Sequence, residues 1–243
     1  MAATVDIVSG GRLIFGIGVG ASLSRRPEPV ELDMARREFD AYGVPLVPTP
    51  QAIGALGEAL TITRRLWTEA EPFDFDGRYY QLKGAIGEPK PFQRPGPPIL
   101  VGAAGERLSL RVVAEHADIW NCPATTPEEL TRKSGILDEH CAAVGRNPAE
   151  IVRSQQILVA RDDAARARDQ ILAFIAAGAT HVVLAVLPPP SGCLLYTSSR
   201  RGPRRTCAPA ARRLPMARSL WPLISGATRG RSASSPVERS TSM

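Results

Sequence analysis

The sequence is poor in the residue types that mark several classes of protein. Aromatic side chains make up only 5% of its 243 residues, and its four cysteines form neither a CxxC pair nor a cluster with histidine. This spacing indicates neither a zinc site nor a disulfide framework, and it fits a reducing compartment. No apolar run approaches the roughly 18 residues that span a membrane, and residues 1–20 lack the basic-then-apolar order of a signal peptide. We therefore predict a cytoplasmic protein with no membrane partner and no metal.

Positive charge is unevenly distributed along the chain. The net charge is +6, but residues 191–243 hold ten of the 30 basic side chains, all ten of them Arg, and only one of the 24 acidic ones. This segment is rich in Arg, Ser, Pro and Gly and has no amphipathic period, so we interpret it as a disordered, non-native tail. The alternative is a disordered arm that binds nucleic acid. Because Tyr196 and Trp221 stand alone among its basic residues, we predict no nucleic-acid partner.

The remainder, residues 1–190, alternates short apolar runs with helical periods and is predicted to be one domain. Strands are predicted at 13–18, 99–102, 118–121, 157–160 and 181–186. Helices are predicted at 51–68, 108–116, 127–144 and 164–177. This order implies a parallel sheet, and the pattern alone leaves open whether the sheet is doubly wound or part of a barrel.

Two further segments depart from this alternation. Residues 73–82 alternate aromatic and polar side chains about Asp76-Gly77, which predicts a β-hairpin outside the main sheet. Asp74 and Asp76 flank its turn, where Asp is favoured by the backbone, so we assign them no acid/base role. Residues 2–8 resemble the end of a helix that feeds a central strand, and we expect further structure to precede them.

Small residues follow the strand predicted at 99–102. Gly102-Ala103-Ala104-Gly105 suits a tight turn, and it equally suits an anion that approaches the N–H groups at the start of the next helix. The residues alone leave both interpretations open. A second glycine run, GIGVG at 16–20, lacks the third glycine of a dinucleotide-binding motif and is followed by a Pro-containing loop, so a Rossmann domain is disfavoured.

Several motifs in fixed order resemble those of the bacterial luciferase-like monooxygenases: SGGRLIFGIGVG, AYGVPLVPT, LTITRRLWTEAEPFDFDGRYYQL, PKPFQRPGPPILVGAAGE and VAEHADIWN. Within that family, the chain is most similar to the actinobacterial branch that uses the deazaflavin coenzyme F420. The resemblance covers residues 4–187 and implies an α/β fold of the (β/α)8 TIM-barrel type, incomplete, with the predicted strands as strands 4 to 8 and the hairpin as an insertion. The family's usual proton-transfer residues would lie in strands 1 to 3, so the catalytic residues stay unknown.

The resemblance also implies where a cofactor would bind. One loop would bring backbone N–H groups against the cofactor phosphate: Gly102, Ala103, Ala104 and Gly105. The neighbouring Glu106 would turn its carboxylate outward, with Arg107 available to screen it. A second loop would lie beside the deazaflavin or flavin ring: Gly18, Val19 and Gly20. Here Ala21 and Ser22 stand where relatives often carry an acid or a Trp, which puts a catalytic role for this loop in doubt.

The implied function is that of a flavin-type oxidoreductase fragment that transfers hydride between coenzyme F420 and a small organic substrate. One alternative is an FMN-dependent monooxygenase that uses oxygen. Another is a fragment that binds a phosphate-bearing ligand or a partner chain without catalysis. We expect the present chain to be inactive by itself, because an open sheet leaves edge strands unpaired, and the full-length form to be a candidate homo-oligomer.

Four other residues invite a functional role. We interpret His116, His140 and His181 as structural, because they lie at a helix end, on a charged helix face and at the start of a strand, respectively. Trp120 lies at the carboxyl end of a predicted strand, where it fits either the core or the wall of a pocket.

Overall fold

The computed structural model describes residues 1–20, 29–160 and 163–186 of the chain. The chain divides into two compact units, Met1–Leu195 and Tyr196–Met243, and every described residue belongs to the first. The tail predicted over 191–243 and the departures at Ala21 and Ser22 lie outside the described residues.

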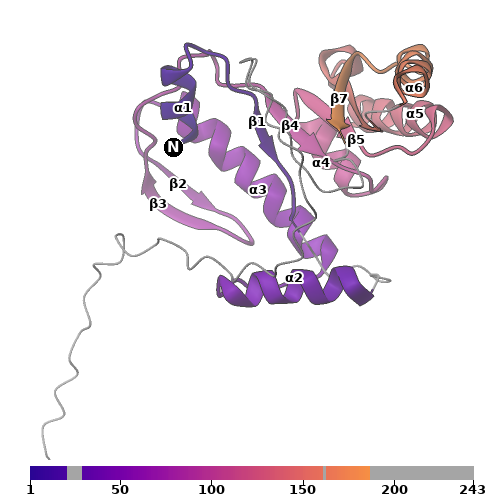
Figure 1. Ribbon diagram of the computed structural model, residues 1–243. Coiled ribbons are helices and arrows are strands. Elements are labelled where there is room, and N and C mark those ends of the chain that lie inside the picture. Colours follow the sequence, from indigo (N-terminus) through magenta and orange to yellow (C-terminus); the bar gives the residue numbers. More distant parts are fainter. Residues whose placement is uncertain (21–28, 161–162, 187–243) are drawn as a thin grey trace, which may run out of the picture. The chain divides into compact units, whose positions relative to one another are not determined.

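Five parallel strands form the main sheet, in the order β1-β4-β5-β6-β7 (Figure 1). They are β1 (Phe15–Ile17), β4 (Ile99–Gly102), β5 (Ile119–Cys122), β6 (Val152–Val159) and β7 (His181–Val186). A doubly wound sheet reverses its strand order at a switch point, whereas here each strand is added on the same side of the previous one. This single direction is that of a (β/α)8 barrel, so the predicted class of an incomplete TIM-type barrel is confirmed.

One helix precedes β1, and the others lie in the connections between these strands. They are α1 (Ala2–Val8), α2 (Pro29–Ala41), α3 (Thr49–Thr68), α4 (Ser109–His116), α5 (Pro127–Ala143) and α6 (Ala164–Ala176), with a short 3₁₀ turn at Pro148–Glu150. Side-chain caps explain two of the helix starts. The Thr126 hydroxyl accepts a hydrogen bond from the Glu129 N–H at the start of α5, and the Asp163 carboxylate accepts one from the Arg166 N–H at the start of α6.

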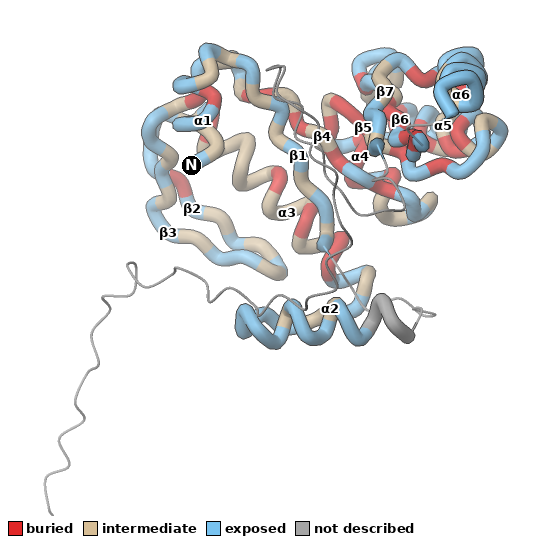
Figure 2. Tube along the Cα trace, in the orientation of Figure 1, coloured by how far each residue is buried: buried red, intermediate tan, exposed pale blue. Residues whose placement is uncertain are grey.

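The core lies on one face of the sheet. Alternate side chains of β4 and β5, such as Val101 and Trp120, form one buried cluster with residues of α3, α4 and α5. The buried residues of these elements are red in Figure 2. On the opposite face the strands are more open, with Leu158 60% and Val183 37% exposed. Helices thus cover one face of β4, β5 and β6, whereas the edge strand β7 is exposed on both faces, since Leu184 and Val186 on the helix side are 49% and 52% exposed.

Two elements differ from the prediction. The strand expected at 157–160 begins at Val152, because its polar residues find partners: Arg153 pairs with Asp138, and Ser154 contacts His181. The segment expected to be a Pro-containing loop holds helix α2, which starts at Pro29. A proline at the first position of a helix is favourable, since its missing N–H would have no intrahelical partner there.

The predicted hairpin is confirmed as a separate two-stranded antiparallel sheet of β2 (Phe73–Asp76) and β3 (Gln81–Ala85). The Glu58 carboxylate of α3 accepts hydrogen bonds from the N–H groups of Arg78, Tyr79 and Tyr80 at 2.7, 2.9 and 3.0 Å. The Asp74 carboxylate is bonded to Lys83 Nζ and to the Gly84 N–H. These acidic side chains hold the hairpin in place and are not arranged as an acid/base pair.

Candidate cofactor site

A pocket of about 460 Å³ lies at the carboxyl ends of β1 and β4, beside the start of α4 and the first half of α3. Its walls are mainly apolar, and the side chains include Val19, Ile53, Leu56, Val101 and Leu108. The whole segment from Gly102 to Glu106 also lines it, whereas Gly18 and Gly20 are not among its lining residues. The pocket therefore joins Val19 to the other predicted loop, at the end of the sheet where barrel enzymes carry their active sites.

The backbone geometry of Gly102 and Gly105 tests whether this loop needs glycine in order to turn. Neither Gly102 nor Gly105 has a positive φ, so the backbone conformation does not demand glycine at either position. A Cβ on Gly102 would meet no heavy atom within 4 Å, and one on Gly105 would lie 3.0 Å from Ser109 Oγ. The protein's own packing therefore gives no reason for the missing side chain at Gly102, which lines the pocket.

Ala103 is fixed at both of its backbone polar groups by the neighbouring strand. Its N–H donates to the Asn121 carbonyl at 3.2 Å, and its carbonyl accepts from the Trp120 indole N–H at 2.9 Å. Ala103 and Trp120 are both buried. The Ala103 N–H is therefore already used within the fold. Trp120 belongs to the core and is not among the residues that line the pocket, but its indole N–H holds the loop.

The next N–H groups are available. Within the part of the chain that the structure describes, the N–H groups of Ala104, Gly105 and Glu106 make no hydrogen bond. Helix α4 follows, with Leu108 at its N-cap position and no side chain capping it. Exposed N–H groups before a helix form a positively polarised surface that suits a phosphate or another anion.

Helix α5 anchors this loop through Glu106. The Glu106 carboxylate is bonded to Arg132 at 2.8 Å, and this hydrogen bond lowers the pKa of the carboxyl below its usual value. The Glu106 carbonyl lies 2.8 Å from His140 Nε2. Arg132 and His140 are eight positions apart and lie on one face of α5. Arg107 was the expected partner of Glu106, and neither Arg132 nor His140 was predicted to anchor the loop. Their spacing on α5 was the available signal.

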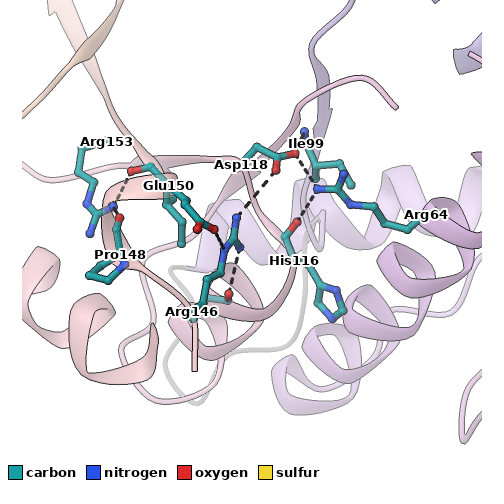
Figure 3. Close-up of polar contacts among 10 residues, drawn as sticks. Arg64, Ile99, His116, Asp118, Arg146, Pro148, Glu150 and Arg153 are labelled. Carbon is teal, nitrogen blue, oxygen red and sulfur yellow. Dashed lines mark hydrogen bonds and ion pairs between the residues drawn. The ribbon is translucent and has the colours of Figure 1, made fainter. Parts of the chain in front are cut away.

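A second polar network lies at the opposite end of the same strands (Figure 3). Asp118 precedes β5, and its Oδ2 accepts from Arg64 Nη2 at 2.7 Å and from the Ile99 N–H at 2.7 Å. The same Arg64 group donates to the His116 carbonyl, and Arg146 lies 3.9 Å from Asp118. Burial lowers the pKa of the His116 ring. This network ties α3 to the amino ends of β4 and β5, where barrels place stabilising groups.

The described residues contain no group of three or more His, Cys, Asp or Glu placed to hold a metal ion. The two thiols that the structure describes are unsuited to nucleophilic chemistry, because burial raises the pKa of Cys122 to about 11 and also raises that of Cys141. Over the same described ranges, no helix is both long and apolar enough to cross a membrane.

Comparison with known proteins gives a family and several relatives. The sequence profile of the luciferase-like monooxygenases matches residues 1–222. An uncharacterized protein of Mycobacterium tuberculosis is 32% identical over 147 residues, which are 60% of this chain and 45% of that protein. A phthiodiolone/phenolphthiodiolone dimycocerosates ketoreductase of the same species is 28% identical over 152 residues, covering 62% of this chain and 35% of the relative. The chain thus spans less than half the length of these curated relatives.

Two solved structures have the same fold. An F420-dependent secondary alcohol dehydrogenase in complex with an F420-acetone adduct gives a TM-score of 0.55 at 17% identity, over 76% of this chain and 67% of that one. The coenzyme F420-dependent tetrahydromethanopterin reductase of Methanopyrus kandleri gives 0.59 at 17% identity, over 77% and 72%. At this identity the likeness supports the architecture described above.

Proposed function

The chain belongs to the luciferase-like monooxygenase family, and on this premise we propose that its pocket binds the phosphate-bearing part of coenzyme F420. The full-length protein would be an oxidoreductase that acts on a small organic substrate. FMN is the alternative cofactor, with oxygen as the second substrate. F420 is placed first because both solved structures compared above are named as F420-dependent enzymes.

One observation carries the proposal: Gly102 lines the pocket, and a Cβ at this position would meet no protein atom within 4 Å. The N–H groups of Ala104, Gly105 and Glu106 follow directly and have no partner in the described chain. A ligand with a negatively charged group of phosphate size would occupy the open space at Gly102 and accept hydrogen bonds from these N–H groups. A tight turn alone would explain neither.

The charges around the loop are compatible with an anion. Glu106 would repel a phosphate, but its carboxylate is bonded to Arg132 of α5. Arg107 lines the pocket and adds a positive charge. The apolar walls formed by Ile53, Leu56 and Leu108 suit the less polar remainder of a cofactor.

The cofactor would supply the hydride chemistry, and the residues of this chain would hold and orient it. The loop residues Ala104 and Gly105 would bind the phosphate, and Trp120 would fix the loop through Ala103. On the face of the sheet away from the helices, Leu158 and Val183 are exposed. A reacting ring on that face would be open to water, so we expect this chain to bind cofactor without turnover. We further propose that the full-length protein is cytoplasmic and forms a homo-oligomer.

Titration of F420 and FMN into the full chain, followed by cofactor fluorescence, tests the proposal. We expect saturable binding, which the Gly102→Leu variant weakens at least tenfold, because its side chain would fill the space beside the loop. Saturable binding of FMN with none of F420 would favour the alternative cofactor. Binding of either cofactor that is unchanged by Gly102→Leu would contradict the proposed site.

Gly135→Leu is a matched control for this experiment. A Cβ on Gly135 of α5, like one on Gly102, would meet no heavy atom within 4 Å. Both variants add the same side chain where the fold has room for it. We expect Gly135→Leu to leave cofactor affinity within about twofold, so that a general effect of an added leucine can be separated from occlusion of the pocket.

A further inference from the structure

Arg107 is the uncompensated charge at the candidate cofactor pocket. Of the described residues that line the pocket, two carry a charge, Glu106 and Arg107. The Glu106 carboxylate is bonded to Arg132 of α5 at 2.8 Å. Arg107 is exposed, and it makes no hydrogen bond or ion pair with any residue that the structure describes. The lining of the pocket therefore retains one positive charge that no carboxylate of the described chain neutralises.

The position of Arg107 is unfavourable for the fold itself. It lies directly before Leu108, the N-cap residue of α4, and the first turn of this helix holds no acidic side chain. The amino end of a helix is positively polarised, so it favours acidic side chains and disfavours basic ones. Helix α5 follows this rule, with Glu128 and Glu129 in its first turn. Because the fold gains nothing from a positive charge at the start of α4, this charge points to an anion from outside the chain.

Arg107 and the loop N–H groups offer two distinct places for negative charge. The unused N–H groups of Ala104, Gly105 and Glu106 lie on the backbone and suit one phosphate. The Arg107 guanidinium follows this loop and stands at the end of a long side chain, and its planar fork of donors matches a carboxylate. A phosphate held by the loop N–H groups would thus leave Arg107 available for a second anionic group.

The two candidate cofactors differ in the number of such groups. FMN ends at its phosphate. In coenzyme F420 the phosphate is a diester that continues into a chain of lactate and glutamate units, and this chain carries carboxylates. A cluster of N–H groups with a separate guanidinium next to it therefore matches F420 better than FMN.

We propose that Arg107 binds a carboxylate of the chain that follows the phosphate in coenzyme F420 and thereby selects F420 over FMN. The inference rests on the proposed function, which assigns the phosphate to the loop N–H groups. Arg107 would determine cofactor specificity and would take no part in hydride transfer. Salt screens an exposed ion pair of this kind, so the preference for F420 should fall as the ionic strength rises.

Fluorescence titration of the full chain with three ligands tests the proposal. The ligands are F420, FMN and deazaflavin 5′-phosphate, which has the ring and phosphate of F420 but no further chain. In low-salt buffer we expect Arg107→Gln to weaken F420 on the order of fivefold and to leave both shorter ligands within about twofold. Arg107→Lys keeps the charge but not the bidentate fork, so its F420 affinity should lie between those of wild type and Arg107→Gln.

Arg111→Gln is the matched control. Arg111 lies one turn further along α4, is also exposed, and is paired with Glu115 outside the pocket. This variant removes the same charge from the same helix, and we expect it to leave the affinities for all three ligands within about twofold. Unchanged F420 binding in Arg107→Gln would overturn the proposal. An equal loss for all three ligands would also overturn it, because Arg107 would then act on the phosphate.

Stability measurements separate a binding role from a structural one. Because Arg107 has no partner in the described chain, we expect Arg107→Gln to unfold at the same urea concentration as wild type or slightly above it. A clear loss of stability would assign Arg107 a structural role and contradict the inference.

The same titrations distinguish a failure of this inference from a failure of the proposed function. Wild-type chain that binds none of the three ligands would contradict the cofactor site, and the role of Arg107 with it. F420 binding that Gly102→Leu weakens and Arg107→Gln leaves unchanged would contradict only the role of Arg107.

Discussion

At the scale of single residues, Ala103 shows how the candidate site is held. Its N–H and carbonyl are bonded to Asn121 and Trp120 of the next strand, while the N–H groups that follow it are unused in the described chain. One residue is thus fixed so that its neighbours can face a ligand. Because the Ala103 carbonyl is buried, losing its indole partner would leave a polar group without compensation.

Trp120→Phe tests this arrangement. The change keeps a large aromatic ring but removes the indole N–H, so we expect a loss of about 1–3 kcal/mol in the free energy of unfolding. We also expect several-fold weaker cofactor binding, because the loop would lose a constraint. Urea denaturation and cofactor titration measure the two effects.

Trp67→Phe provides the comparison. Trp67 is 7% exposed and packs edge-on against Phe15, and its indole N–H has no hydrogen-bond partner in the described chain. We expect this variant to lose stability through packing alone and to keep its cofactor affinity. If Trp67→Phe weakened the cofactor as much as Trp120→Phe did, the hydrogen bond to Ala103 would not be the cause.

At the scale of elements, helices act as anchors for segments outside the main sheet. Helix α5 holds the candidate loop through Arg132 and His140, and α3 holds the hairpin through Glu58. Burial alone would raise the pKa of Glu58, but the three N–H groups at the hairpin turn outweigh it and lower the pKa. The hairpin is a two-stranded sheet, and such a sheet is only marginally stable by itself. The hydrogen bonds from Glu58 therefore keep the hairpin ordered.

Glu58→Gln should therefore loosen the hairpin. The neutral amide offers one acceptor oxygen where the carboxylate serves three donors, and we expect a cost of about 1–3 kcal/mol. Hydrogen exchange should accelerate at the amides of Arg78, Tyr79 and Tyr80 and along β2 and β3, with little change in β4 to β7. Glu71→Gln, at an exposed position before the hairpin, should leave these rates unchanged. Equal acceleration in both variants would argue against the anchor.

At the scale of the whole molecule, the two ends of the main sheet carry different features. The carboxyl ends carry the pocket, and the amino ends carry the network around Asp118. Near the pocket end, the first turn of α5 adds an acid-sensitive element. Glu129 is bonded to Lys133 and also to Thr125, and these contacts lower its pKa from 4.5 to about 2.

Acid unfolding should report on Glu129. Its folded pKa lies below its ordinary value, so its contribution to stability is complete above about pH 4.5 and is lost as the pH falls toward 2. Urea denaturation at several pH values should show a shallower loss of stability in Glu129→Gln than in wild type, with the two curves converging near pH 2. Glu128→Gln, an exposed neighbour in the same turn, should follow the wild-type curve. Parallel curves for wild type and Glu129→Gln would refute this role.

Local sequence pattern was sufficient for most of the fold. The strands Ile99–Gly102 and His181–Val186 and the hairpin follow from runs of neighbouring residues, and they occur where predicted. Helix α2 was missed because proline was taken as a breaker, although Pro29 is the first residue of the helix. The early part of β6 was missed because Arg153 and Ser154 are polar, and their partners Asp138 and His181 are distant in sequence.

The sequence by itself determined the order of β/α units, the family resemblance and the loop of small residues at Gly102, because each is written in contiguous residues. Only the tertiary structure decided which N–H groups of that loop are used, which side chains of α5 anchor it, and that Ser154 of β6 contacts His181 of β7. These features join residues that lie 17 to 34 positions apart. Parallel strands with helical crossovers bring such distant residues together. The hydrophobic periodicity of a single segment does not predict which distant residues will be in contact.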